Sequence, residues 1–262
     1  MTALRHALEM RLAEARLAMM MLTRFPVGRL SDPSPSAAAT CWAFPLAGLA
    51  VGALTALVLV GLLWLGVPSG VAAGLTLAAG ILATGGLHED GLADVTDGFG
   101  GGRTRDRKLE IMRDSRIGTY GALALILMLG LRWSALTTVI EREPIDALLA
   151  VVAIAIVSRS VLPLVLGILP PARSDGLGHG SANPGRTRIF ASIVLGGLAL
   201  TGLLGGETAL AISAALCMTL LLGAWWAYRQ IGGQTGDVLG AIQQTTDLCA
   251  WIVVLVLSES LI

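Results

Sequence analysis

Long runs of apolar residues dominate this sequence and limit the folds that are open to it. They cover about residues 41–65, 70–87, 118–140, 146–169, 189–206 and 207–228, with a shorter run at 248–262. Most approach the roughly 20 residues that a helix needs to cross a hydrocarbon core ~30 Å thick. The composition agrees, because 55% of the residues are hydrophobic and only 14% are charged. We therefore predict an all-α, polytopic integral membrane bundle of about six to seven transmembrane helices, with residues 1–262 as a single domain.

The charged residues are distributed unevenly between these runs. Their formal sum is +0, so no bulk field favours a nucleic-acid partner. If all the runs cross, one side of the membrane receives the N-terminus and polar loops at about 88–117, 170–188 and 229–247, which carry most of the connecting arginines. The positive-inside rule places that side in the cytoplasm. On it we also expect an amphipathic, interface-lying helix, because Arg and Glu interrupt Leu, Ala and Met at helical spacing in the first 25 residues.

A cluster of acids follows the second apolar run, in the stretch HEDGLADVTDG that begins at His88. Asp90, Asp94 and Asp97 stand at i, i+4 and i+7, which places them on one face of a helix. Carboxylates beside hydrocarbon must be neutralised, and hard oxygen ligands suit Mg²⁺ or Mn²⁺. The alternative is a solvated loop whose acids offset the arginines after it. His88 lies across the turn from this stripe and is expected to form a hydrogen bond or to carry a proton.

The next stretch, FGGGRTRDRKLEIMRDSRIG, is rich in glycine and basic residues. Its glycines permit a close approach of the backbone to an anion, and the six cations from Arg103 to Arg116 can meet phosphate. Acids for a divalent cation beside cations for phosphate are typical of a phosphoryl-transfer site.

Other polar residues interrupt apolar surroundings further along the chain. Gln234, Thr235 and Asp237 in GGQTGDVLG form either a helix-entry turn or a second carboxylate patch that completes a metal site. Arg159 lies within an apolar run, so it should face the bundle interior, in an ion pair or against substrate. Arg132 lies nearer the outer end of its run and is expected to extend toward the membrane surface.

Several of these stretches, taken in order, resemble one known family. HEDGLADVTDG, RDRKLEIMRDSRIGTYG and GGQTGDVLGA, with LTRFPV and FPLAG near the start, are similar to the cobalamin synthases, the adenosylcobinamide-GDP ribazoletransferases of bacterial and archaeal inner membranes. The resemblance runs essentially from end to end. It implies a Mg²⁺-dependent, multi-pass enzyme of the cytoplasmic (inner) membrane that joins adenosylcobinamide-GDP to α-ribazole or its 5′-phosphate and releases GMP. At Asp247 the chain departs from the family, in which a longer glutamate is frequent.

The chemistry implied by the resemblance gives each candidate residue a role. Carboxylates are expected to hold Mg²⁺ against the diphosphate, cations to neutralise the phosphate charge, and one residue to accept the proton of the attacking hydroxyl. The metal ligands would be Asp90, Asp94, Asp97 and Asp237; the cations Lys108, Arg113 and Arg116; the proton acceptor Asp97 or His88; and the other substrate contacts Arg159, Gln234 and Thr235.

Two other functions are alternatives to this one. A CDP-alcohol phosphatidyltransferase also uses aspartates at the ends of membrane helices, but its motif requires an arginine where Asp94 follows Ala93. A cation transporter would place its carboxylates near the membrane midplane, whereas these acids are expected at a loop. Besides the substrates and the lipid bilayer, a second copy of the chain, forming a homo-oligomer, stays among the expected partners.

Overall fold

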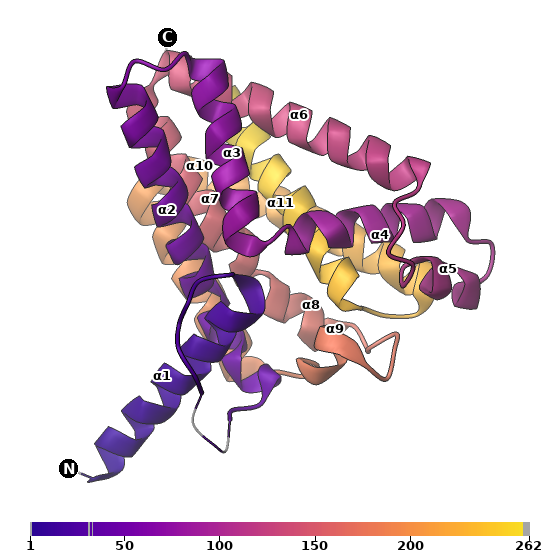
Figure 1. Cartoon of the computed structure of the whole chain (residues 1–262). Coiled ribbons are helices and arrows are strands. Elements are labelled where there is room, and N and C mark those ends of the chain that lie inside the picture. The colour runs from indigo at the N-terminus through magenta and orange to yellow at the C-terminus, as the bar shows by residue number, and fades with distance from the viewer. Residues whose placement is uncertain (1, 31, 33, 259–262) are drawn as a thin grey trace.

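The structure is a computed structural model that describes residues 2–30, 32 and 34–258, and the regular elements within these ranges are all helices. In chain order they are α1 (Thr2–Leu22), η1 (Ala37–Ala43), α2 (Phe44–Trp64), α3 (Ser69–Thr84), α4 (Leu87–Gly101), α5 (Arg105–Ile111), α6 (Thr119–Arg142), α7 (Pro144–Ser160), α8 (Leu162–Ile168), α9 (Gly176–Gly180), α10 (Arg186–Ile231) and α11 (Gly236–Leu257). Figure 1 shows them as a bundle of long helices. The predicted all-α architecture is confirmed.

Several of these helices have the length and hydropathy of membrane spans. Five qualify on their own, and six if α3 and α4 together form one bent span. In two of the five, a short neighbour extends the long helix: η1 precedes α2, and α8 follows α7. The predicted polytopic membrane protein is therefore confirmed.

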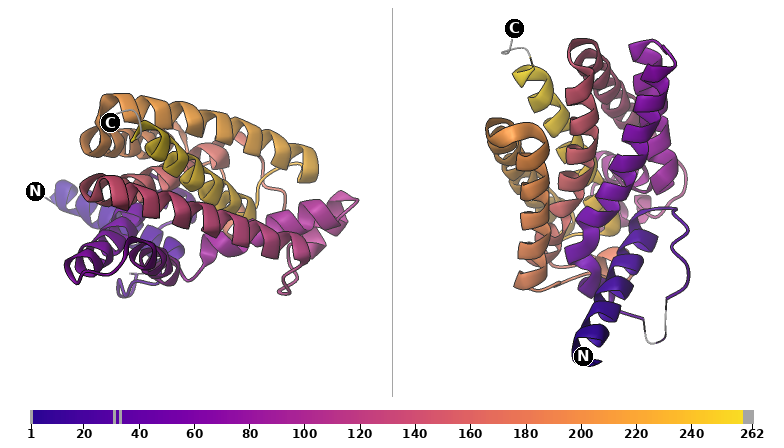
Figure 2. Two further views of the ribbon diagram at one scale, coloured as in Figure 1. Left: turned by 90° about the horizontal axis from the view of Figure 1, so that it is seen from above. Right: turned by 90° about the vertical axis from the view of Figure 1, so that its left-hand side faces the viewer.

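The longest helix, α10, consists of two arms that meet at Gly205, where φ is 79° and ψ is 167°. Glycine adopts this conformation without steric cost. Gly196 of the first arm packs against Ser160 of α7, and Gly223 of the second arm packs against Ile242 of α11. A straight helix would separate the two glycines by about 40 Å, yet α7 and α11 are hydrogen-bonded to each other at this level. The arms therefore form a hairpin (Figure 2), so both spans predicted on either side of this break are present.

Helix α7 lies at the centre of the bundle because its residues are small. Ala147, Ala150 and Ala153 have no exposed surface. Helix α2 approaches them through Gly48, where a Cβ atom would lie 2.3 Å from the backbone oxygen of Ala155. Small residues on facing helices allow this backbone-to-backbone packing in membranes.

Two of the predicted polar loops contain helices. The region 88–117 is mostly helical, since it contains α4 and α5, and α11 begins at Gly236, inside the loop predicted at 229–247. The reason is a bend: Gly85 and Gly86 both have positive φ, of 70° and 71°, and α4 leaves α3 at 88°. The acidic stretch therefore continues as a helix across the end of the bundle, as Figure 1 shows.

The polar connections gather at one end of the bundle. Figure 1 shows α4, α5, α8 and α9 at the same end as α1, with the C-terminal end of α11 at the opposite end. This arrangement agrees with the alternation of sides expected from the sequence. The predicted N-terminal helix is present as α1, and Leu4, Leu8 and Leu12 on it are exposed.

Candidate active site

Helices α4 and α11 touch where each carries a glycine. A Cβ atom at Gly91 of α4 would lie 2.8 Å from the backbone oxygen of Asp237. A Cβ atom at Gly240 of α11 would lie 3.2 Å from the Cα atom of His88. Because any larger residue would collide with backbone, these glycines permit the contact. The crossing brings the acids of α4 beside the first turn of α11.

An open pocket lies at this crossing, with about 830 Å³ of empty space, its mouth included. Its wall is built by the start of α4, the segment after α8 and the turn into α11, which belong to the three polar regions singled out in the sequence. Its polar and charged lining residues are His88, Asp90, Arg173, Asp175, Ser181, Thr235 and Asp237.

Three of the predicted metal ligands come together here. Asp90 and Asp237 line the pocket, and Asp94, one turn further along α4, interacts electrostatically with both. Arg173 lies among them: its Nη1 atom is 3.3 Å from Asp237 Oδ2, and its Nη2 atom donates a hydrogen bond to the backbone oxygen of Leu109 at 3.3 Å. The site thus combines hard oxygen ligands with one guanidinium.

Sequence reasoning did not single out Arg173 as a functional residue. It lies in the polar stretch PPARSDGLGHG, which separates two apolar runs. An arginine and an aspartate in such a stretch were the available signal. The sequence does not show that this stretch lies beside the acidic stripe, because the two are far apart along the chain. Backbone hydrogen bonds of Gln234 with Pro170 and Ala172, both at 2.8 Å, hold the stretch against the turn into α11.

Asp97 has different partners from the other predicted ligands. Its Oδ2 atom accepts a hydrogen bond from the N–H of Gly118 at 2.7 Å, and its Oδ1 atom accepts one from the N–H of Gly121 at 2.9 Å. Both donors belong to the start of α6, where the helix dipole also favours a carboxylate. Asp97 therefore anchors α6 to α4, and the pocket wall does not include it.

His88, predicted to form a hydrogen bond or to carry a proton, lines the pocket and is 3% exposed. Its Nε2 atom has no hydrogen-bond partner among the described residues. A buried polar nitrogen without a partner is costly, so a ligand that bonded to it would gain stability.

Gln234 and Thr235, predicted to contact substrate, both shape the turn into α11. Gln234 is 1% exposed, and its Nε2 atom donates a hydrogen bond to the backbone oxygen of Gly178 at 2.9 Å, which attaches the segment after α8. Thr235 caps α11 by accepting a hydrogen bond from the N–H of Val238 at 3.2 Å. Its hydroxyl also donates to Asp237 Oδ2 at 3.2 Å, and of the two residues only Thr235 lines the pocket.

The predicted phosphate-binding arginines lie outside the pocket wall. Arg113 Nη2 bonds both carboxylate oxygens of Asp175, a lining residue, at 2.8 and 2.9 Å. Arg116 pairs with Asp114 at 2.7 Å, and its side chain is 87% exposed. The Arg116 guanidinium lowers the pKa of Asp114 to about 2. Arg113 is thus one residue away from the site, while Arg116 belongs to the surface.

The glycine-rich stretch after Asp97 packs against protein. A Cβ atom at Gly98 would lie 2.5 Å from the Met112 side chain, and one at Gly100 would lie 2.8 Å from the Tyr120 ring. Lys108, predicted to bind phosphate, instead donates a hydrogen bond to Gln230 at the end of α10. Gly98 and Gly100 therefore pack against neighbouring side chains, whereas Gly101 is exposed, and the approach of an anion to this stretch stays a prediction.

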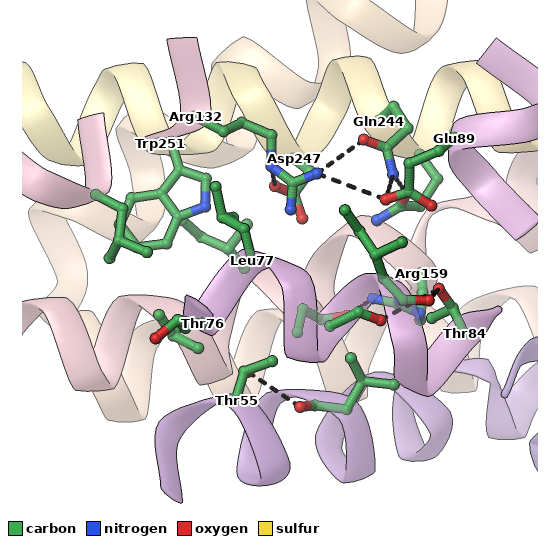
Figure 3. Close-up of a pocket in the computed structure, with 18 residues that line it drawn as sticks. Thr55, Thr76, Leu77, Thr84, Glu89, Arg132, Arg159, Gln244, Asp247 and Trp251 are labelled. Atoms are coloured by element: carbon green, nitrogen blue, oxygen red, sulfur yellow. Dashed lines mark hydrogen bonds and ion pairs between the residues drawn. The ribbon is translucent and has the colours of Figure 1, made fainter. Parts of the chain in front are cut away.

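Two arginines of the apolar runs point into a second pocket, inside the bundle (Figure 3). Arg159 is 4% exposed, as predicted for the bundle interior, and its Nη1 atom donates a hydrogen bond to Ala155 of its own helix at 2.9 Å. It does not line the pocket that holds Asp90. The prediction for Arg132 is wrong, because its side chain is only 13% exposed and forms an ion pair with Asp247 at 3.0 Å.

The donor set at the crossing can be tested against a divalent cation. No three His, Cys, Asp or Glu side chains within the described ranges are close enough together to form a complete metal site. Mg²⁺ usually needs only one or two carboxylates, because waters and substrate phosphates supply its other ligands. Asp90 and Asp237, with Asp94 beside them, fit an ion that binds together with a phosphate-bearing substrate.

Comparison with known proteins adds independent information. Residues 14–255 match the family described as cobalamin-5-phosphate synthase. An adenosylcobinamide-GDP ribazoletransferase of Mesorhizobium japonicum is 46% identical over 244 residues, which cover 92% of each chain. Its counterpart in Bradyrhizobium diazoefficiens is 46% identical over 243 residues, 92% of this chain and 93% of the relative. No solved structure matches the chain significantly.

Proposed function

Since this chain belongs to the cobalamin-5-phosphate synthase family, we propose that it joins adenosylcobinamide-GDP to α-ribazole, or to α-ribazole 5′-phosphate, and releases GMP. The product would be adenosylcobalamin or its 5′-phosphate. The structural observation that carries the proposal is the meeting of Asp90, Asp237 and Arg173 at one open pocket, with Asp94 one turn further along α4. Phosphoryl transfer needs carboxylates for a divalent cation beside a cation for phosphate oxygens.

In this proposal Asp90 and Asp237, with Asp94 beside them, would hold Mg²⁺ together with the substrate, and the ion would supply positive charge for the diphosphate. Arg173 faces the same space and donates hydrogen bonds to phosphate oxygens, for which its planar guanidinium is well suited. Arg113 acts one step further out, since it holds Asp175 in the pocket wall. Thr235 fixes Asp237 through the hydrogen bond between their side chains.

The reaction forms one P–O bond and breaks another. A hydroxyl oxygen of the ribazole attacks the phosphorus attached to cobinamide, and the bond from that phosphorus to the GMP oxygen breaks in line. The hydroxyl proton needs an acceptor. We assign it to His88, which lines the pocket, because both oxygens of Asp97 already accept hydrogen bonds from α6.

The direct experiment is a GMP-release assay on purified protein in lipid nanodiscs, with adenosylcobinamide-GDP, α-ribazole and Mg²⁺. We expect GMP to appear only when both substrates are present and to stop when EDTA removes the metal. GMP formation without ribazole would indicate a hydrolase, and turnover that EDTA leaves intact would contradict the metal assignment.

The family match does not favour the two other functions. A CDP-alcohol phosphatidyltransferase would release CMP from CDP-diacylglycerol, and a cation transporter would move ions with neither cobinamide nor ribazole present. The same nanodisc preparation can be assayed for both activities, and we expect neither.

A further inference from the structure

We propose that Arg132 of α6 is a positioning residue for the proposed active site, because it holds α4 and α11 in the orientation in which their carboxylates meet. This inference rests on the proposed function. Arg132 acts with Glu89, Gln244 and Asp247, and we call these four residues the polar clamp. The wall of the pocket at the α4–α11 crossing includes none of the four. Their effect on the reaction must therefore pass through the helices that carry them.

The polar clamp joins three helices inside the bundle (Figure 3). Arg132 Nε lies 3.0 Å from Asp247 Oδ1, and Arg132 Nη1 lies 3.9 Å from Glu89 Oε1. The Nη1 atom also donates a hydrogen bond to Gln244 Oε1 at 2.8 Å. Gln244 Nε2 in turn donates to Glu89 Oε1 at 2.9 Å. One guanidinium of α6 thus reaches both α4 and α11.

The members of the clamp are shielded from solvent. The side chains of Arg132 and Glu89 are each 13% exposed, and that of Asp247 is 6% exposed. A buried ion pair adds little net stability compared with apolar residues of the same size, but the loss of one partner leaves a costly isolated charge. Such a pair can therefore select one arrangement of helices over others. Selecting an arrangement is what a site shared between two helices requires.

The backbone before α4 does not fix the orientation of this helix, so side-chain contacts must do so. Gly85 and Gly86, which precede α4, have positive φ, and α3 and α4 meet at 88°. Where α4 touches α11, Gly91 and Gly240 bring the two backbones close together. Buried apolar side chains of both helices, among them Val95 and Ile242, line the groove beside this crossing. The ion pair and hydrogen bonds of the polar clamp add directional contacts to this apolar packing, and directional contacts select one angle between the helices.

The clamp and the carboxylates lie on opposite sides of the crossing along α11. Gln244 and Asp247 follow Gly240 by about 6 and 10 Å along the helix axis, whereas Asp237 precedes it by about 4.5 Å. A tilt of α11 that breaks the clamp therefore displaces Asp237 relative to Asp94. A displacement of about 1 Å at a reacting centre can lower the rate ~10²-fold.

The test compares Arg132→Gln with Arg142→Gln in the GMP-release assay. Arg142 is a matched control, since it links the other end of α6 to α11 by donating to Leu255 O and Ser258 Oγ, both at 3.0 Å. We expect kcat to fall about 10- to 100-fold in Arg132→Gln, with a smaller change in KM, and to stay normal in Arg142→Gln. Arg132→Lys keeps the charge and should recover part of the loss.

The orientation itself can be measured without turnover. Nitroxide labels on cysteines placed at Thr96 of α4 and Thr245 of α11, in a background whose native cysteines are alanine, report the distance between the helices; both positions line an outer groove. We expect Arg132→Gln to broaden the distance distribution. The double variant Arg132→Gln/Asp247→Asn should broaden it no further, because the pair acts as a unit.

An unchanged distance distribution in Arg132→Gln, or an unchanged kcat per folded molecule, would overturn the proposal. Should Arg132→Gln fail to fold, Arg132→Lys and Asp247→Asn give the same comparison with milder changes. If the unmodified protein released no GMP, the proposed function would fail, while the spin labels would still decide whether the clamp sets the helix orientation.

Discussion

Among the cations near the pocket, we expect Arg173 to be the one that binds phosphate. It lines the pocket, it is 3.3 Å from Asp237, and its side chain is only 14% exposed. Its Nε atom has no hydrogen-bond partner within the described ranges. Arg116 is its opposite, because it pairs with Asp114 on the surface. We therefore expect Arg173 to contact phosphate and Arg116 only to balance the charge of Asp114.

Replacement of Arg173 by glutamine should lower kcat/KM for GMP release by about 10²-fold or more, the loss typical of a removed transition-state donor. Arg173→Lys should recover only part of this loss, because an ammonium cannot make the two-pronged contact of a guanidinium. Arg116→Gln is the matched control and should leave kcat/KM and the melting temperature close to normal. Equal losses in Arg173→Gln and Arg116→Gln would remove Arg173 from the site.

A second prediction at this scale concerns the metal. Asp90→Asn, Asp94→Asn and Asp237→Asn each keep the shape of the side chain and remove a ligand charge, so each should raise the Mg²⁺ concentration needed for half-maximal GMP release. Asp106→Asn is the control, since that side chain is 94% exposed and outside the pocket. A Mg²⁺ titration of all four variants decides the question, and normal titrations for Asp90→Asn, Asp94→Asn and Asp237→Asn would contradict the assignment.

The role of a residue can be predicted from sequence when its partners are close along the chain, and not when they lie on other helices. The sequence singles out Asp90 and Asp94 because helical periodicity is local, and Asp237 because it breaks an apolar context, and the structure brings the three close together. Asp97 shares the periodicity, but sequence could not show that the N–H groups of Gly118 and Gly121 take up its oxygens. Arg132 was misjudged because its partners lie on other helices.

Glycines decide how the helices of this bundle meet. Hydropathy predicted where most helices lie, since twenty apolar residues have few alternatives in a bilayer. It could not predict the bend after α3 or the start of α11, because these depend on positive φ at Gly85 and Gly86 and on the cap formed by Thr235. The same motifs that carry the acids also carry Gly91 and Gly240, so the motif encodes packing as well as chemistry.

Gly91→Ala should therefore damage the site without touching a charged residue. Its new methyl group would lie 2.8 Å from the backbone oxygen of Asp237, so α4 and α11 must separate, at a cost of about 1–3 kcal/mol. Gly61→Ala in α2 is the control, because no atom lies within 4 Å of its Cβ position, and it should be neutral or stabilising by up to ~1 kcal/mol. Thermal unfolding in detergent, together with GMP release, compares the two, and equal stability of both variants would contradict the close contact.

Over the whole molecule, the polar connections and the proposed active site share one end of the bundle. The short connections after α2 and α6 lie at the other end (Figure 1), which leaves the site end to carry the arginine-rich segments. Arginine-rich and short connections alternate along the sequence, and folding places the arginine-rich ones at one end of the bundle and the short ones at the other. From the positive-inside rule we expect the pocket to face the cytoplasm, where nucleotide-linked substrates would reach it.

This orientation can be measured by labelling single cysteines in intact cells with a membrane-impermeant thiol reagent, after the native Cys41, Cys217 and Cys249 have been replaced by alanine. Thr104→Cys and Gly180→Cys report the site end, Glu143→Cys reports the opposite end, and all three positions are exposed. We expect label on Glu143→Cys alone, and label on the other two only after the membrane is permeabilised, because the excess of arginine holds the site end in the cytoplasm. Permeabilised cells show that each cysteine can react. Label on Thr104→Cys and Gly180→Cys in intact cells, with Glu143→Cys protected, would reverse the molecule in the membrane and place the pocket outside the cytoplasm.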